Sequence, residues 1–385
     1  MNIALDTSSL VISKKRGIGN YAIGLYNELF RIDQENRYYL FVWKEQTEFE
    51  DLEYGNNVQT YFTGLSYKEV YSEEQYEQVV TSFLNENKID VFYFPNAVSL
   101  DMPLVRKKWF GDTKLAATIH DIIPWMMKEK FLTSGETEIK YRSYYENLKE
   151  YDILFANSEK TKEDTESHFE VSSIINISMS SHKKVKERVG DEQAWEIVRK
   201  KYGINGTYIL TVGGFSHNKN YPRLVQAYNK FVNKCNGHLQ ILLTGNVPAN
   251  VKENLNFYLK NNKLEEKVIV PGVVSDEELE MLYFNAHWVV FPSLYEGFGM
   301  PVIEAWQHGV PVLTSGTTSL KEISDGAAIH VDPSDVESIT DGLCRLQKMT
   351  ESEREEYIRL GKEKLNDFSW NKTAKLWIKE IKKLK

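Results

Sequence analysis

The chain has 385 residues and a net charge of −8, which argues against a nucleic-acid partner because such a partner needs a basic face. Hydrophobic residues make up 42% and charged residues 26%, as in globular proteins, and the length exceeds what one hydrophobic core usually supports, so we expect two domains. With two cysteines, no secretory signal and no apolar run of membrane-spanning length, we expect a cytoplasmic protein, or one at the inner face of the membrane.

The first half of the chain alternates between expected strands and helices. Short β-rich apolar runs predict buried strands at residues 2–6, 38–43, 90–95, 114–120 and 152–156. Helical spacing predicts helices at 21–31, 73–86 and 136–148, and Ser158 suits the N-cap of a further helix. Gly17 and Gly19 stand in an expected loop, 13–20, and such a pair marks a flexible turn as often as a ligand-facing loop.

A polar and basic stretch, 171–190, reads as the connection to a second alternating series. This series predicts strands at 208–212, 238–244, 268–270, 288–292 and 310–314. Helices are expected at 192–202, 301–308, 335–346 and 352–365 and after Pro222, and Ser275 with Glu278 fits a capping box. The fold class is therefore α/β, with two doubly wound parallel-sheet domains at 1–185 and 186–369, and helix 370–385 is expected to pack back on the first.

The stretch EGFGMPVIE, from Glu296 to Glu304, is the most informative motif. It places a glycine-bearing turn between a buried strand and the start of a helix. The amides from Phe298 through Gly299 to Met300, together with the helix dipole, favour an anion. A carboxylate on each side can accept hydrogen bonds from sugar hydroxyls. The motif therefore predicts a ligand with phosphate and hydroxyl groups, such as a nucleotide sugar.

At these motifs the chain resembles retaining glycosyltransferases of the GT-B fold, in the large family 4 ("group 1") that is marked by two glutamates separated by seven residues. The matching segments follow one another along nearly the whole chain: GIGNY at Gly17, TIHDIIP around His120, ANSEKTKED from Ala156, VGGFSHNKN with Lys219, VPGVVSDEEL and EGFGMPVIE. The resemblance implies two Rossmann-like domains that face each other across a cleft.

The resemblance also implies a role for individual residues. His120, Glu296 and Lys219 would be catalytic: His120 beside the transferred sugar, Glu296 on its hydroxyls and Lys219 on the diphosphate. Glu304 would accept from the ribose. The implied donor-binding residues are Gly17, Gly19, Gly214, Lys219, Val273, Glu296, Phe298, Gly299, Met300 and Glu304.

One position departs from the family pattern. Many relatives carry an arginine five residues before the lysine, where this chain has Gly214. The second cation on the diphosphate is therefore unassigned, and neither His217 nor Arg223 is an evident replacement. Lys219 and His120 each have an ordinary alternative to a role in the site. A lysine in a loop is commonly a solvated surface charge, and a histidine at a strand end is commonly structural.

The expected function is retaining transfer of a sugar from a nucleotide diphosphate sugar, UDP or GDP, to a glycan or lipid-linked glycan in cell-surface polysaccharide synthesis. The chain has no convincing Asp-x-Asp motif, so we expect neither a metal nor another cofactor. The alternatives are a nucleotide-sugar epimerase and a non-catalytic glycosyltransferase-like binding subunit. Residues 106–110 and the basic end of the chain also suggest contact with an anionic membrane, although an amphipathic stripe more commonly faces a core.

Overall fold

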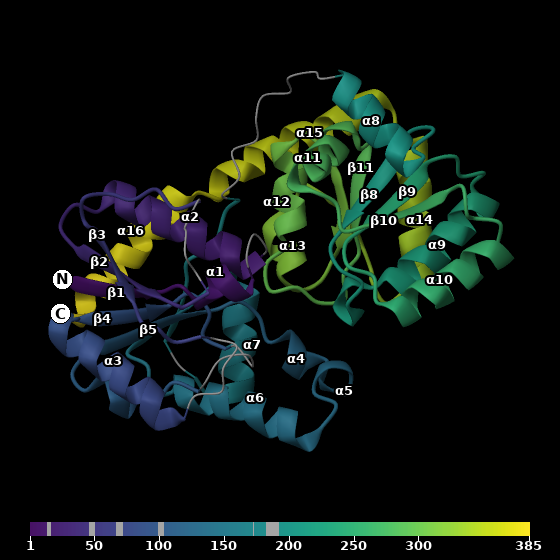
Figure 1. Ribbon diagram of the computed structural model, residues 1–385. Coiled ribbons are helices and arrows are strands. Elements are labelled where there is room, and N and C mark those ends of the chain that lie inside the picture. Colours follow the sequence, from purple (N-terminus) through teal and green to yellow (C-terminus); the bar gives the residue numbers. More distant parts are fainter. Residues whose placement is uncertain (14–16, 46–50, 67–71, 99–103, 172, 182–191) are drawn as a thin grey trace. The chain divides into compact units, whose positions relative to one another are not determined.

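In the computed structural model, residues 1–13, 17–45, 51–66, 72–98, 104–171, 173–181 and 192–385 are described, and they form two compact units (Figure 1). Unit 1 is Met1–His182 with Phe368–Lys385, and unit 2 is Lys183–Asp367. Each is an α/β unit built on one parallel sheet, so the prediction of two doubly wound parallel-sheet domains is confirmed. The boundary expected between 185 and 186 lies outside the described residues, and the expected facing of the two domains stays a prediction.

Unit 1 contains a parallel sheet with the strand order β3-β2-β1-β4-β5-β6-β7 among the described residues. Its strands are β1 (Asn2–Asp6), β2 (Arg37–Val42), β3 (Val58–Phe62), β4 (Val91–Phe94), β5 (Lys114–Ile119), β6 (Ile153–Ala156) and β7 (Ile174–Asn176). Its helices are α1 (Ser8–Ile12), α2 (Gly17–Ile32), α3 (Glu73–Asn87), α4 (Ile123–Met126), α5 (Lys128–Phe131), α6 (Gly135–Leu148), α7 (Glu159–Phe169) and α16 (Trp370–Ile381). In Figure 1, α2 and α16 cover one face of the sheet, and α3 and α6 cover the other.

Three sequence-based expectations for unit 1 need correction. Gly17 and Gly19 lie in the first turn of α2 rather than in a loop before it. The stretch read as a connection contains strand β7, which has three residues and therefore too short a pattern to detect. Edge strand β3 was missed because its sequence, VQTYF, is short and mostly exposed and so lacks a buried apolar run. The N-cap expected at Ser158 is confirmed, since its hydroxyl accepts from the amide of Thr161.

Helix α16 belongs to the core of unit 1. Trp377 is fully buried, and its ring packs edge-on against Tyr93, with ring centroids 5.1 Å apart. Trp370 packs on α2 at Gly24, where a Cβ atom would lie 2.2 Å from the indole. The apolar stripe of α16 is therefore occupied by contacts within its own unit.

The segment at 106–110 likewise gives its aromatic side chains to the core, because Trp109 and Phe110 are 3% and 2% exposed. This corrects the interpretation of these two rings as membrane contacts.

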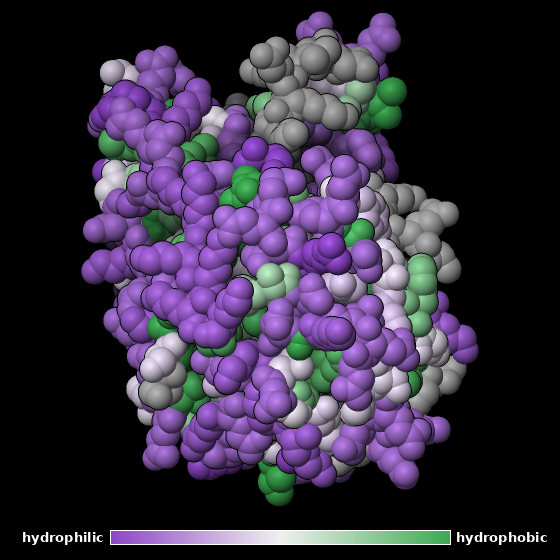
Figure 2. All heavy atoms as spheres, turned by 90° about the vertical axis from the view of Figure 1, so that its left-hand side faces the viewer, coloured by the Kyte–Doolittle hydropathy of each residue, from purple (hydrophilic) through white to green (hydrophobic). Residues whose placement is uncertain are grey.

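The face drawn in Figure 2 is mainly hydrophilic, with hydrophobic residues only in small separate groups. Among the described residues, no helix combines the length and the apolar character needed to cross a bilayer.

Unit 2 contains a parallel sheet with the strand order β10-β9-β8-β11-β12-β13 among the described residues. Its strands are β8 (Tyr208–Val212), β9 (Gln240–Thr244), β10 (Val268–Gly272), β11 (Trp288–Phe291), β12 (Val312–Ser315) and β13 (Ile329–Val331). Its helices are α8 (Glu192–Tyr202), α9 (Tyr221–Lys234), α10 (Ala249–Asn261), α11 (Asp276–Asn285), α12 (Met300–Gln307), α13 (Thr318–Ser324), α14 (Val336–Lys348) and α15 (Glu351–Lys364). Helices α9, α10 and α14 cover one face, and α8, α11, α12 and α15 cover the other (Figure 1).

Two local features of unit 2 bear on the sequence analysis. The capping box at Ser275 and Glu278 is confirmed at the start of α11. Cys235, at the end of α9, and Cys344, in α14, form a disulfide with their Cα atoms 5.9 Å apart.

Candidate functional site

The strand order of unit 2 reverses between β8 and β11, which lie side by side. From β8 the chain continues outward to β9 and β10, and from β11 it continues to β12 and β13 on the other side. The loops that follow β8 and β11 therefore leave the same edge of the sheet and diverge. Such a switch point is where open α/β sheets bind ligands. One loop carries Lys219 and the other carries Glu296.

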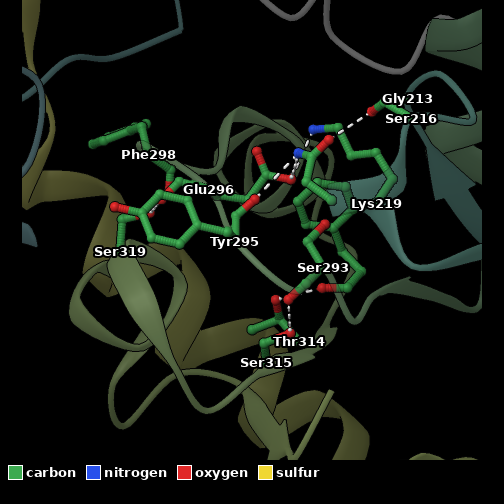
Figure 3. Close-up of polar contacts among 12 residues, drawn as sticks. Gly213, Ser216, Lys219, Ser293, Tyr295, Glu296, Phe298, Thr314, Ser315 and Ser319 are labelled. Atoms are coloured by element: carbon green, nitrogen blue, oxygen red, sulfur yellow. Dashed lines mark hydrogen bonds and ion pairs between the residues drawn. The ribbon is translucent and has the colours of Figure 1, made fainter. Parts of the chain in front are cut away.

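Lys219 and Glu296 meet at this switch point (Figure 3). The ammonium group of Lys219 lies 2.7 Å from Oε1 of Glu296. It also lies over the ring of Phe291, 5.0 Å from the centroid. Glu296 is 7% exposed, so its charge is largely removed from water and depends on this partner. The structure thus brings together two residues that the sequence assigned to separate parts of one ligand.

Asn218 supports the same pair from within the β8 loop. It is 4% exposed, and its amide nitrogen donates to the main-chain oxygen of Tyr295 at 3.2 Å and lies 3.5 Å from Oε1 of Glu296. The hydroxyl of Ser216 donates to Oδ1 of Asn218 at 2.6 Å. These bonds cross-link the β8 loop to the β11 loop, and they fix the direction of the Glu296 side chain.

The glycine turn of the motif is backed by helix α13. The Ser319 hydroxyl lies 2.7 Å from the main-chain oxygen of Glu296 and 2.8 Å from that of Phe298 (Figure 3). Gly299 has φ = 127°, a conformation that favours glycine, and a Cβ atom there would lie 2.6 Å from Cδ2 of Leu320. The turn is therefore shaped by α13 before α12 begins at Met300.

Helix α12 begins directly after this turn, with Pro301 in its first turn as expected. The first amides of a helix have no partner within the helix, and with the dipole they favour an anion. One turn further on, the carboxylate of Glu304 accepts from the Tyr283 hydroxyl at 2.9 Å. Phe298 is 4% exposed, so its side chain packs in the core.

Two further predicted donor-binding residues of unit 2 are Gly214, in the same loop as Lys219, and Val273, in another loop. Gly214 follows β8, and a Cβ atom there would meet only the Asn246 main-chain oxygen, at the ordinary contact distance of 3.8 Å. Arg223 donates to Oδ1 of Asn220 at 3.2 Å. Val273 lies between β10 and α11 and is 61% exposed.

His120 lies at the carboxyl end of β5 in unit 1. Its Nε2 atom lies 2.7 Å from the main-chain oxygen of Pro95, and a carbonyl only accepts, so Nε2 carries the proton. The ring is 8% exposed, and burial lowers the pKa of His120 to about 4. At neutral pH the imidazole is therefore neutral, and its Nδ1 atom is an acceptor for a hydroxyl rather than an acid.

Gly17 and Gly19 belong to the same end of the unit 1 sheet as His120. Tyr21, two residues after Gly19 in α2, packs edge-on against the His120 ring with centroids 4.7 Å apart. Its hydroxyl bonds to those of Tyr93 and Thr118, each at 2.9 Å. Gly17 is exposed, and no atom lies within 4 Å of where its Cβ would be. The first turn of α2 and His120 thus form a second group of predicted residues in unit 1.

Histidine, cysteine, aspartate and glutamate, the residue types that commonly bind metals, do not cluster in the part of the chain that the structure describes. In the described ranges, no group of three or more histidine, cysteine, aspartate or glutamate side chains could hold a metal ion. Metal independence remains a prediction for experiment.

Known proteins resemble this chain in sequence and in fold. Residues 196–364 match the family model described as glycosyl transferases group 1. This segment is similar to the group 1 glycosyltransferases. The segment includes the Lys219, Glu296 and Glu304 positions on which the resemblance rests.

Several relatives of this chain are named mannosyltransferases. The serotype-specific mannosyltransferase WbdA of Escherichia coli is 27% identical over 277 residues, 70% of this chain and 34% of WbdA. The O-antigen chain mannosyltransferase B of Escherichia coli is 34% identical over 164 residues, 42% of each chain. The match thus spans about one third of the length of WbdA.

Solved structures resemble the fold over the whole chain. Sucrose-phosphate synthase from Thermosynechococcus elongatus aligns with a TM-score of 0.76 and 17% identity, covering 100% of this chain and 99% of that one. HepE from Anabaena, in complex with UDP and glucose, aligns with a TM-score of 0.70 and 14% identity, covering 100% of both chains. At these identities the likeness shows the fold alone.

Sequence reasoning missed three residues that shape this site. Asn218 is adjacent to Lys219, and an amide side chain next to a predicted ligand-binding lysine was a usable signal. Ser319 closely follows strand β12, next to β11, so its place at the same sheet edge was another. Tyr283 gave no signal, because it lies 21 positions before Glu304 with strand β11 between them.

Proposed function

We propose that the protein is a glycosyltransferase that moves a hexose from a nucleoside diphosphate sugar to a glycan or lipid-linked glycan in cell-surface polysaccharide synthesis. The observation that carries this proposal is the Lys219–Glu296 pair, 2.7 Å apart at the switch point beside the start of α12. Lys219 offers a cation, and the start of α12 offers amides, to a diphosphate. Glu296 offers a carboxylate to sugar hydroxyls. Mannose is the first donor sugar to test, because several relatives are named mannosyltransferases. GDP and UDP are the first nucleotides to test.

In the proposed reaction, the bond between the anomeric carbon and the phosphate oxygen breaks, and negative charge grows on the departing diphosphate. Lys219 and the amides at the start of α12 stabilise that charge. The acceptor hydroxyl attacks from the face that the diphosphate leaves, and its proton passes to the departing phosphate oxygen. Configuration is then retained, no metal is required, and neutral His120 serves as a hydroxyl acceptor.

A ligand screen followed by a transfer assay tests this proposal. Thermal shifts are measured with GDP, UDP, dTDP and ADP and with their sugars, since a ligand of the folded state raises the melting temperature. The expected result is that nucleotides with one particular base raise the melting temperature. Sugar transfer from that donor should then continue in the presence of a chelator and retain the anomeric configuration. Inverted product, or activity lost to a chelator, contradicts the mechanism.

Two other outcomes of this screen indicate the alternatives. Binding without donor hydrolysis and without transfer to any acceptor indicates a binding subunit. Conversion of the donor sugar into its epimer indicates an epimerase. Cosedimentation with anionic vesicles tests the separate proposal of peripheral membrane association, and no binding contradicts it.

A further inference from the structure

The Tyr283–Glu304 hydrogen bond connects helices α11 and α12. Its length is 2.9 Å, Tyr283 is 2% exposed and Glu304 is half-buried. Burial, and then the charge of Glu304, raise the pKa of Tyr283 well above its usual value. The phenol therefore stays protonated and donates, while the carboxylate accepts. Hydrogen bonds to charged groups are among the stronger ones in proteins.

The tyrosine ring is itself fixed by the end of α12. His308 stacks on it with ring centroids 5.0 Å apart and planes inclined by 16°. The Nδ1 atom of His308 lies 2.7 Å from the main-chain oxygen of Glu304, so Nδ1 donates to it. Tyr283, His308 and Glu304 thus form one packed group, in which the tyrosine hydroxyl has a defined position relative to the carboxylate.

Such an arrangement has a consequence for binding. A glutamate on a helix surface has many rotamers, and ordering it when a ligand binds costs conformational entropy. If a buried donor already orients the carboxylate, much of this entropy is lost when the protein folds rather than when the ligand binds. The ligand then binds more tightly. We propose that Tyr283 is a positioning residue, which holds the Glu304 carboxylate in the orientation that accepts the ribose hydroxyls of the donor nucleotide. This inference rests on the proposed function.

The test compares ligands that differ only in the ribose hydroxyls. Titration calorimetry measures the affinity of the full-length protein and of Tyr283→Phe for GDP or UDP, whichever the wild type binds, and for its 2′,3′-dideoxy analogue. The wild type is expected to prefer the ribose form by about tenfold or more, the effect of a charged hydrogen bond. In Tyr283→Phe this preference shrinks several-fold, while affinity for the dideoxy form stays unchanged.

Two further variants separate positioning from general damage. Glu304→Gln is expected to remove most of the ribose preference, which sets the scale of the full effect. Tyr228→Phe loses a comparable buried bond, to the main-chain oxygen of Leu239 at 2.6 Å, and should keep the wild-type preference. A melting curve for each variant shows that it is folded.

The outcomes distinguish this inference from the function on which it rests. If the wild type binds no nucleotide, the proposed function fails and the inference fails with it. If wild type and Glu304→Gln differ in ribose preference but Tyr283→Phe matches the wild type, only the inference is overturned. Equal weakening of the ribose and dideoxy ligands by Tyr283→Phe also overturns it, because that pattern indicates a purely structural role.

Discussion

Lys219 and Glu296 come from loops after two neighbouring strands, and their charged groups lie 2.7 Å apart with Glu296 almost completely buried. The pair therefore satisfies its own charges before any donor arrives. A diphosphate that binds Lys219 must share the lysine with Glu296, and a sugar that binds Glu296 benefits from the carboxylate that Lys219 holds in place. Under the proposed function, recognition of the two ends of the donor would therefore be coupled through this one ion pair.

The first prediction concerns this coupling. Lys219→Met leaves Glu296 buried without its cation and should lower the stability to urea by about 3 kcal/mol. The double variant Lys219→Met with Glu296→Gln should recover most of that loss, because no unpaired charge remains. Lys230→Met, which breaks an exposed pair with Glu337, is the control and should cost less than about 1 kcal/mol. Additive losses in the double variant contradict the coupling.

The second prediction concerns the support of the glycine turn by α13. Ser319→Ala removes the hydroxyl that bonds to the oxygens of Glu296 and Phe298, so stability should fall by about 1 kcal/mol. Because the turn carries the amides proposed for the diphosphate, donor affinity should also fall. Ser324→Ala, on the same helix but bonded to the main-chain oxygen of Leu320, should affect stability alone. Calorimetric titration with the donor nucleotide measures the difference, and equal affinities for the two variants speak against this support.

A third prediction compares two glycines with positive φ. Gly299→Ala places a methyl group against Leu320 in addition to the strain of φ = 127°, and overpacking alone should cost about 1–3 kcal/mol. Gly326 has φ = 77° with no atom within 4 Å of the position that a methyl group would occupy, so Gly326→Ala meets the backbone strain alone. Chemical denaturation should rank Gly299→Ala as the more destabilising change, and the reverse order contradicts the role of α13.

The fourth prediction concerns pH. The folded-state pKa of His120 is about 4 and lies below the ordinary value of 6.5, so the unfolded chain binds the proton first. The contribution of His120 to stability should therefore fall as pH decreases from 6.5 toward 4, by roughly 3 kcal/mol. His120→Gln keeps a donor toward Pro95 but lacks this titration. Its stability should accordingly decline less than that of the wild type over the same range, as followed by thermal melts at several pH values.

Asp6 opposes His120 in the same pH range. Burial raises the pKa of Asp6 from 3.8 to about 6, so its contribution to stability is present at low pH and is lost as pH rises through 6. The two slopes have opposite signs and largely offset one another in the wild type. Asp6→Asn should therefore show a steeper loss of stability on acidification than the wild type. A shallower loss would contradict the assigned direction.

Much of the fold was predictable because its signals are local. Strand β11 is a short apolar run, and β8 and helix α8 were located to the residue, since periodicity and caps lie within each element. Strand β3 lacked such a signal, because an exposed edge strand needs no apolar face. The first turn of α2 was missed because glycine has low helix propensity, so GIGNY reads as a loop.

The candidate site was predictable to the extent that its residues share one motif. Glu296 and Glu304 are eight positions apart in sequence, and Lys219 has a recognisable turn around it. The hydrogen bonds from Tyr283 and Ser319 depend on which helices pack beside α12, and only the folded chain determines this. The burial that keeps His120 neutral is likewise a property of tertiary packing, so its role as an acceptor could not be read from its neighbours in sequence.

The position of α16 affects how this chain matures on the ribosome. Trp377 fills the centre of the unit that contains β1, yet it is synthesised after every residue of unit 2. Unit 2 is complete when residue 367 has emerged, and it can fold while the earlier unit still has a gap in its core. The N-terminal half is therefore expected to need protection from aggregation throughout synthesis, and a released chain truncated after residue 367 should leave it open to protease while unit 2 resists.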